Sequence, residues 1–127
     1  MRDRTERAEG GSDTPNSVRI GLLLDFYGEL LTSRQKELAI YYYEDDLSLG
    51  EISDITGLTR QGVRASLEKS KQLLLRYEEK LGLAGRFSEA RKESDRIAAE
   101  TEKLRAGENA DIAALCEAAS RLQALYD

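Results

Sequence analysis

The side chains best suited to chemistry lie in one stretch near the middle of the chain. Four of them recur at three- and four-residue steps and a fifth precedes them directly, a spacing that places them along one exposed side of a helix: Gln61, Arg64, Glu68 and Lys71, with Arg60. Guanidinium and ammonium groups bind phosphates and carboxylates, and Arg and Gln also hydrogen-bond the edges of bases. The spacing therefore predicts a surface that binds a nucleic acid or an acidic protein partner.

Side chains that could support catalysis are scarce. The 127 residues include no His and a single Cys, Cys116. Lack of His removes the Ser-His and Cys-His nucleophile pairs and the usual nitrogen ligand of zinc. The acidic run at 44–46 has no further ligands at suitable spacing, and the chain has no Gly-rich phosphate loop. We predict a non-enzymatic protein without cofactor or metal, in which Cys116 is a small buried apolar residue.

The charge is unevenly distributed. The whole chain has 19 basic and 24 acidic residues, a net charge of −5 and a pI near 4.9. Residues 59–80 nevertheless hold six cations and three carboxylates, whereas residues 18–58 have a net charge of −5. Because phosphate contacts dominate nucleic-acid affinity, this balance predicts weak and salt-sensitive binding by a monomer.

Two amphipathic segments position the basic face. Ser48 and Glu51 form a capping box that begins a short helix, and Gly57 suits the left-handed residue that ends one. Thr59 then caps a longer helix, so that Gly57, Leu58 and Thr59 form a three-residue turn. The apolar residues predicted to meet around this turn are Ile52, Ile55, Leu58, Val63 and Leu67. This pattern is typical of a helix-turn-helix unit.

The second helix of this unit is predicted to be long, ending at Gly82 and Gly85. Its apolar stripe continues through Leu74, Tyr77 and Leu81, beyond the reach of the short helices before it. Those three residues are expected to contact the C-terminal helices or a second subunit, which makes a homodimer a working hypothesis.

The remaining pattern predicts an all-α protein with a three- or four-helix core and a C-terminal helical extension. Residues 1–17 have almost no apolar side chains and are predicted to be a disordered tail. Residues 18–83 form the helix-turn-helix domain, with helices over 18–31 and from a capping box at Thr32 through about Tyr43. Residues 84–127 form the extension, broken near 107–109. Of Tyr41, Tyr42 and Tyr43, we expect Tyr42 and in part Tyr41 to pack in the core. The alternative is that an exposed Tyr stacks on RNA bases or fills a pocket of a protein partner, and the acidic neighbours favour the protein.

Several motifs in the first part of the chain resemble the YlxM family. They are Phe26-Tyr27-Gly28-Glu29-Leu30-Leu31-Thr32, Gln35, Tyr41-Tyr42-Tyr43, Asp46-Leu47-Ser48-Leu49, Glu51-Ile52-Ser53, Thr59-Arg60-Gln61-Gly62-Val63-Arg64 and Tyr77-Glu78-Glu79-Lys80-Leu81. The chain has Gly62 where family members usually have Ala. The family comprises small bacterial helix-turn-helix proteins similar to region 4 of sigma factors, encoded beside the signal recognition particle GTPase and its receptor.

The resemblance implies a cytoplasmic regulatory protein of the signal recognition particle pathway. Its partners would be the particle's GTPase, its receptor or its RNA, contacted through the basic helix. The alternative is a transcriptional regulator whose sigma-like helix places Arg60, Gln61 and Arg64 in the major groove of DNA. No apolar run in the sequence is long enough to predict a membrane-spanning helix.

Overall fold

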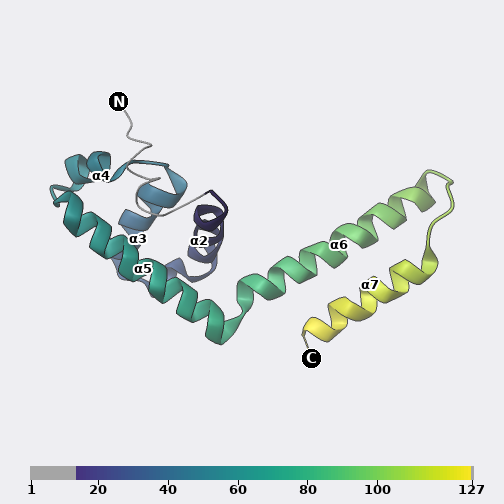
Figure 1. Ribbon diagram of the computed structural model, residues 1–127. Coiled ribbons are helices and arrows are strands. Elements are labelled where there is room, and N and C mark those ends of the chain that lie inside the picture. Colours follow the sequence, from purple (N-terminus) through teal and green to yellow (C-terminus); the bar gives the residue numbers. More distant parts are fainter. Residues whose placement is uncertain (1–13, 127) are drawn as a thin grey trace. The chain divides into compact units, whose positions relative to one another are not determined.

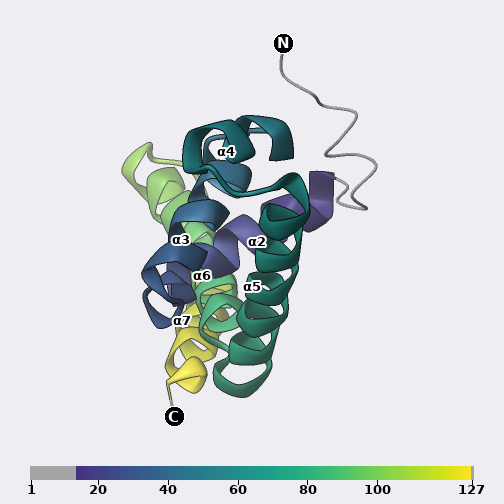
Figure 2. The ribbon, with the colours of Figure 1, turned by 90° about the vertical axis from the view of Figure 1, so that its left-hand side faces the viewer.

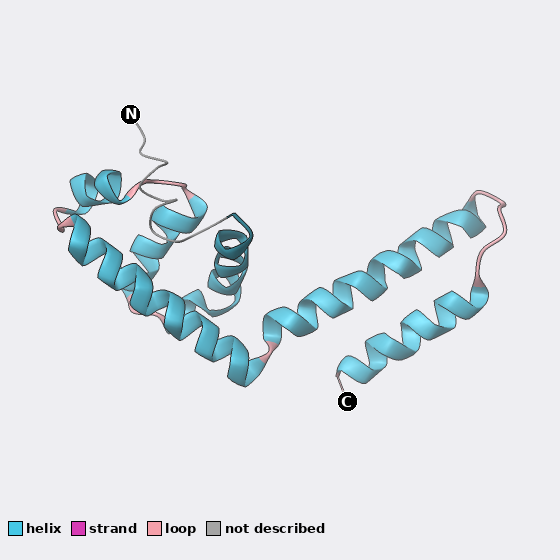
Figure 3. Ribbon diagram, viewed as in Figure 1, coloured by secondary structure: helices cyan, strands magenta, loops and turns pink. Residues whose placement is uncertain are grey.

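The computed structural model describes residues 14–126, and all of the regular elements in that range are helices (Figure 3). The prediction of an all-α fold is confirmed. The chain divides into two compact units, Met1–Gly82 and Leu83–Asp127, one residue from the boundary placed at 83/84. Of the predicted disordered tail, residues 1–13 lie outside the described range. Residues 14–17 instead belong to the first described helix, which begins at Thr14.

The first unit begins with helix α2 (Thr14–Tyr27), followed by a short 3₁₀ turn, η1 (Gly28–Leu30) (Figure 1). The buried residues of α2 share one stripe, Ile20, Leu23, Leu24 and Tyr27. This stripe packs against the long helix of the unit, α5 (Arg60–Leu81). The Tyr27 hydroxyl, 1% exposed as a residue, donates a hydrogen bond of 2.6 Å to Glu78 Oε1 of α5. One apolar stripe and one polar contact therefore join the ends of the unit.

Helix α3 (Ser33–Ala39) begins at the predicted capping box. Gln35 N donates to Thr32 Oγ1 at 3.1 Å, and Thr32 N donates to Gln35 Oε1 at 3.0 Å. Instead of continuing as an α-helix through Tyr43, the chain widens into a π-helix, η2 (Ile40–Glu44), in which Asp45 N donates to Ile40 O at 2.9 Å. Asp46 then takes a positive φ of 59°. The acidic run thus begins at the last residue of η2, and the turn that leads into it is wider than an α-turn.

Helix α4 (Leu49–Thr56) and helix α5 form the helix-turn-helix. Ser48 and Glu51 make the predicted capping box, and Gly57 ends α4 with a φ of 78°. Thr59 Oγ1 accepts from Gly62 N at 2.9 Å and so begins α5. Helices α3 and α4 both pack against α5, and Figures 1 and 2 show α4 at its N-terminal end. The turn at 57–59 is the predicted one.

A compact apolar cluster lies at the junction of these helices. Its buried members are Leu38, Tyr42, Leu49, Ile52, Val63 and Leu67. Tyr41, Tyr43, Leu47 and Leu58 pack around them, so the burial expected of Tyr42 is confirmed. Ile55 was expected to join this core, but it is 56% exposed. In this two-turn helix the buried side runs through Leu49 and Ile52, and Ile55 lies off that side.

The second half of α5 corrects the expected contacts of its apolar stripe. Leu74 is fully buried within the single chain, so its burial does not require a second subunit. Tyr77 lies against Tyr27 of α2, with ring centroids 6.0 Å apart. Leu81 is 46% exposed. Gly82 ends the helix with a φ of 64°, whereas Gly85 lies inside the next helix and was wrongly expected to help end α5.

The second unit is a hairpin of α6 (Leu83–Arg105) and α7 (Ile112–Leu125), which pack against each other. The break falls at the predicted position near Gly107. Two carboxylate residues of α6, Glu93 and Glu100, are buried. Glu100 Oε2 accepts from Asp111 N at 3.3 Å. Cys116 was expected to be buried and is exposed, because Ala118 occupies the inner face of α7.

Candidate functional site

The five candidate side chains lie on the N-terminal half of α5, beside its buried stripe. Val63, Leu67 and Ser70 are buried, which fixes the rotation of the helix. Arg60, Gln61, Arg64 and Glu68 are exposed, and Lys71 is half-buried. The α5 backbone therefore presents this face to solvent while the neighbouring stripe holds the helix in place.

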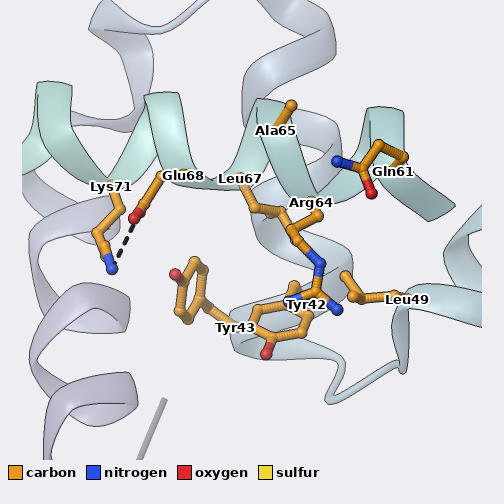
Figure 4. Close-up of a pocket in the computed structure, with 9 residues that line it drawn as sticks. All are labelled: Tyr42, Tyr43, Leu49, Gln61, Arg64, Ala65, Leu67, Glu68 and Lys71. Atoms are coloured by element: carbon orange, nitrogen blue, oxygen red, sulfur yellow. Dashed lines mark ion pairs between the residues drawn. The ribbon is translucent and has the colours of Figure 1, made fainter. Parts of the chain in front are cut away.

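Four of the five side chains border one groove of about 290 Å³, shown in Figure 4. The α5 side of the groove consists of Gln61, Arg64, Ala65, Leu67, Glu68 and Lys71, and the other side consists of Tyr42, Tyr43 and Leu49. In Figure 4, Arg64 extends from α5 toward Tyr42 and Leu49. Sequence reasoning found the polar side of this groove but not its aromatic side.

The aromatic side of the groove depends on the π-helix. A π-turn holds more residues than an α-turn, so successive side chains are separated by a smaller angle. The Tyr42 and Tyr43 rings lie edge to face with centroids 5.0 Å apart, and both line the groove. The three consecutive tyrosines were the available signal in the sequence, but their joint placement required the wider turn.

Arg60 lies apart from the groove residues, against the first turn of α4. A Cβ atom added at Gly50 would lie 2.8 Å from Arg60 Nη2 and 3.1 Å from Arg60 Cζ. The guanidinium thus occupies space that only a glycine at position 50 leaves open. We call this arrangement the Arg60–Gly50 contact. It places Arg60 at the junction of the two helices of the helix-turn-helix.

The charge at the groove comes from α5. Arg64 and Lys71 are cationic, although Lys71 Nζ is paired with Glu68 Oε2 at 3.0 Å. Glu44 and Asp45 follow Tyr43 in the chain and are exposed, but they do not line the groove. Burial raises the pKa of Glu44 above its ordinary value, and the neighbouring Asp25 and Asp45 carboxylates raise it further. The charged residues that line the groove therefore all belong to α5.

Hydrogen bonds join the end of α4 to the turn that follows it. Ser53 Oγ donates to the Leu58 carbonyl, and Leu58 N donates to Thr56 Oγ1 at 3.3 Å. Ser53 therefore contacts the turn through its hydroxyl. These polar groups of the turn therefore find their partners within a few residues, which makes the corner between α4 and α5 locally rigid.

Within residues 14–126, no group of three or more Cys, Asp or Glu side chains is arranged to hold a metal ion. None of the described helices is both long and apolar enough to cross a membrane.

Two helices joined by a three-residue turn, with cations on the exposed face of the second, define a helix-turn-helix protein. The family model described as "UPF0122: Putative helix-turn-helix protein, YlxM / p13 like" matches residues 15–112. The chain belongs to this family, which confirms the resemblance seen in the sequence.

Three curated UPF0122 proteins illustrate the similarity. The UPF0122 protein of Desulforamulus reducens is 50% identical over 74 residues, which are 58% of this chain and 63% of that protein. The protein of Caldanaerobacter subterraneus is 49% identical over 76 residues, covering 60% and 65% of the two chains. That of Listeria innocua is 40% identical over 85 residues, covering 67% and 77%. The match thus spans less than two thirds of the length of the first two relatives.

Proposed function

We propose that this protein is a non-enzymatic regulator of the signal recognition particle pathway and acts in the cytoplasm. In this proposal, the N-terminal half of α5 binds the particle's RNA or one of its GTPases. Membership of the YlxM-like family supports the pathway, since the resemblance implies it. A role in binding agrees with a helix-turn-helix protein that displays cations on an otherwise acidic body.

The observation that carries the proposal is the position of the candidate face. Residues 60–81 hold six cations and three carboxylates, and the rest of the first unit is acidic. A local basic surface of this kind attracts phosphates and acidic protein surfaces, whereas the acidic remainder of the unit repels them. Arg64, Glu68 and Lys71 lie together at the groove, so one partner can contact all three at once.

DNA binding is the second candidate. Arg60 and Gln61 are the first two residues of α5, the end of a recognition helix that enters the major groove. The net charge of −5 over residues 18–58 weighs against it, because those residues would lie near the phosphates.

The test is a direct binding assay with purified particle GTPase, receptor, particle RNA and promoter DNA, each at two salt concentrations. We expect binding to at least one component of the particle, and loss of that binding in Arg60→Glu/Arg64→Glu. The matched control is Arg76→Glu/Lys80→Glu, which makes the same charge change on exposed positions of the same helix. Binding to duplex DNA alone would overturn the pathway assignment. Equal loss in both variants would show that net charge, not this face, is responsible.

A further inference from the structure

The groove between α5 and the tyrosines has the features of an anchor site for a protein partner. Its walls are apolar where they are deepest, since Leu49 and Tyr42 are buried and Tyr43 is half-buried. Its volume of about 290 Å³ is at the lower limit of small-molecule sites. A pocket of this size suits one or two large apolar side chains of a protein, the anchors that dominate binding energy at interfaces.

The distribution of charge specifies the partner further. Arg64 and Lys71 border the groove on α5, whereas residues 18–58 of the same unit have a net charge of −5. A nucleic acid that inserted a base here would bring a run of phosphates close to this acidic part of the unit, which repels them. A protein segment can instead carry only the few carboxylates that face α5. The charge distribution therefore favours a protein over an RNA strand in this groove.

The spacing of the two cations suggests a helical segment. Arg64 and Lys71 are seven residues apart on α5, or about 10.5 Å along its axis. A second helix lying along α5 has residues seven positions apart at the same separation and on one face. Apolar residues three or four positions apart on that helix can then enter the groove. Lys71 is already paired with Glu68, so a partner carboxylate would share or replace that contact.

From these observations we infer that the groove formed by Tyr42, Tyr43, Leu49 and α5 binds an acidic amphipathic helix of a protein partner. The helix inserts large apolar side chains between the tyrosines and Leu67 and directs its carboxylates to Arg64 and Lys71. The inference rests on the proposed function in using the same face of α5, and it assigns the groove itself to protein rather than RNA.

The probe is a 16-residue helical peptide with Leu and Phe at positions i and i+4 and Glu residues seven positions apart. A second peptide has Lys in place of each Glu. Added to the ¹⁵N-labelled full chain, the Glu peptide should shift the amide signals of Tyr43, Arg64 and Lys71. We expect the Lys peptide to bind at least tenfold more weakly. Equal affinity for the two peptides, or no shifts at the groove, would overturn the inference.

Two pairs of variants separate the groove from the fold. Tyr43→Ser should lower affinity for the Glu peptide at least tenfold, whereas Tyr41→Ser should change it less than twofold. Both tyrosines are partly buried against the same core, but only Tyr43 lines the groove. Arg64→Glu, at an exposed position that leaves the core intact, should reverse the preference between the peptides, and Arg76→Glu should not. Equal effects within either pair would contradict the inference.

Two further arms test other occupants. A single-stranded RNA 12-mer that shifts the same signals more strongly than the Glu peptide would assign the groove to a base. A mass in light scattering that doubles with concentration in wild type, but not in Tyr43→Ser, would assign it to a second copy of the chain. The proposed function fails separately: if no particle component binds but the Glu peptide does, the pathway assignment is lost and the groove assignment stands.

Discussion

Substitution of Gly50 by Ala tests how tightly Arg60 is held at the corner of the helix-turn-helix. Gly50 is the second residue of α4, and an added Cβ would lie 2.8 Å from Arg60 Nη2 and 3.3 Å from Arg60 Nε. Contacts below 3.0 Å require one partner to move. The guanidinium is the end of a flexible side chain on an exposed residue, so we expect Arg60 to move and α4 to keep its place.

The expected change in stability is the sum of two opposing effects. Ala gains up to about 1 kcal/mol over Gly in a helix. Displacing an exposed guanidinium costs a similar or smaller amount, of the order measured for surface ion pairs, about 0–1 kcal/mol. Gly50→Ala alone should therefore change the free energy of unfolding by between about 0 and +1 kcal/mol. In an Arg60→Ala background the clash is absent, and the full helix gain of about 1 kcal/mol is expected.

Urea unfolding of the four proteins in this double-mutant cycle measures the coupling. The midpoint should shift without a change in slope, because the surface exposed on unfolding is the same. The Arg60 Nε–H signal in NMR spectra should move in Gly50→Ala, which reports the displacement directly. If Gly50→Ala changes the free energy of unfolding equally in both backgrounds, to within about 0.3 kcal/mol, the two residues are independent. The Arg60–Gly50 contact then contributes nothing to stability.

Three further predictions concern stability. Tyr27→Phe removes a hydrogen bond to the Glu78 carboxylate and should lower the free energy of unfolding, measured in urea, by about 1–2 kcal/mol. Glu78→Gln keeps an acceptor without the charge and should lower it less. Equal losses in the two variants would contradict the role of charge. Ser70→Ala removes a buried hydroxyl without a hydrogen-bond partner and should raise the melting temperature, corresponding to about 1 kcal/mol; a fall would contradict this. Because the pKa of Glu44 is raised, its ionised form disfavours folding above that pKa and the penalty disappears below pH 4.5. Glu44→Gln should thus raise the melting temperature at pH 7 and leave it unchanged at pH 3.5, and a gain at both would refute the assignment.

The helix boundaries of the first unit were predictable because their signals are local. Thr32 with Gln35, and Ser48 with Glu51, satisfy backbone groups only three residues away. Gly57 takes the left-handed conformation that its position at the end of α4 requires. Each of these interactions can be recognised in a short window of sequence, since the donor, the acceptor and the turn lie within it.

The errors have their origin in packing between distant residues. Ile55 follows Ile52 by three residues and fits a helical stripe, but the short α4 presents its other side to α5. Leu74 looked too far along α5 to be covered by its own domain, yet it is buried in the unit in which α2 packs against α5. Helical periodicity identifies an apolar face but does not say which neighbour covers it.

For the same reason, the sequence predicted the α5 side of the candidate site but not its tyrosine side. The charged residues of α5 follow helical spacing, so their common face could be deduced. The groove depends in addition on the π-turn at Ile40–Glu44, for which the sequence has no simple rule, and on the tertiary packing that brings Tyr42 and Tyr43 of that turn to the same groove as α5. Gly50 illustrates the limit well. In the sequence it reads as an ordinary member of a capping box, and only the coordinates place a guanidinium over it.

The caps at Thr32, Ser48 and Thr59 also bear on how quickly the first unit acquires its structure. Because each of these helices carries its own start signal, short stretches can begin to coil before distant parts of the chain meet. Proteins dominated by such near-neighbour contacts reach the native state in microseconds to milliseconds. We therefore expect α4, the turn at 57–59 and the start of α5 to fold together as soon as α5 emerges from the ribosome.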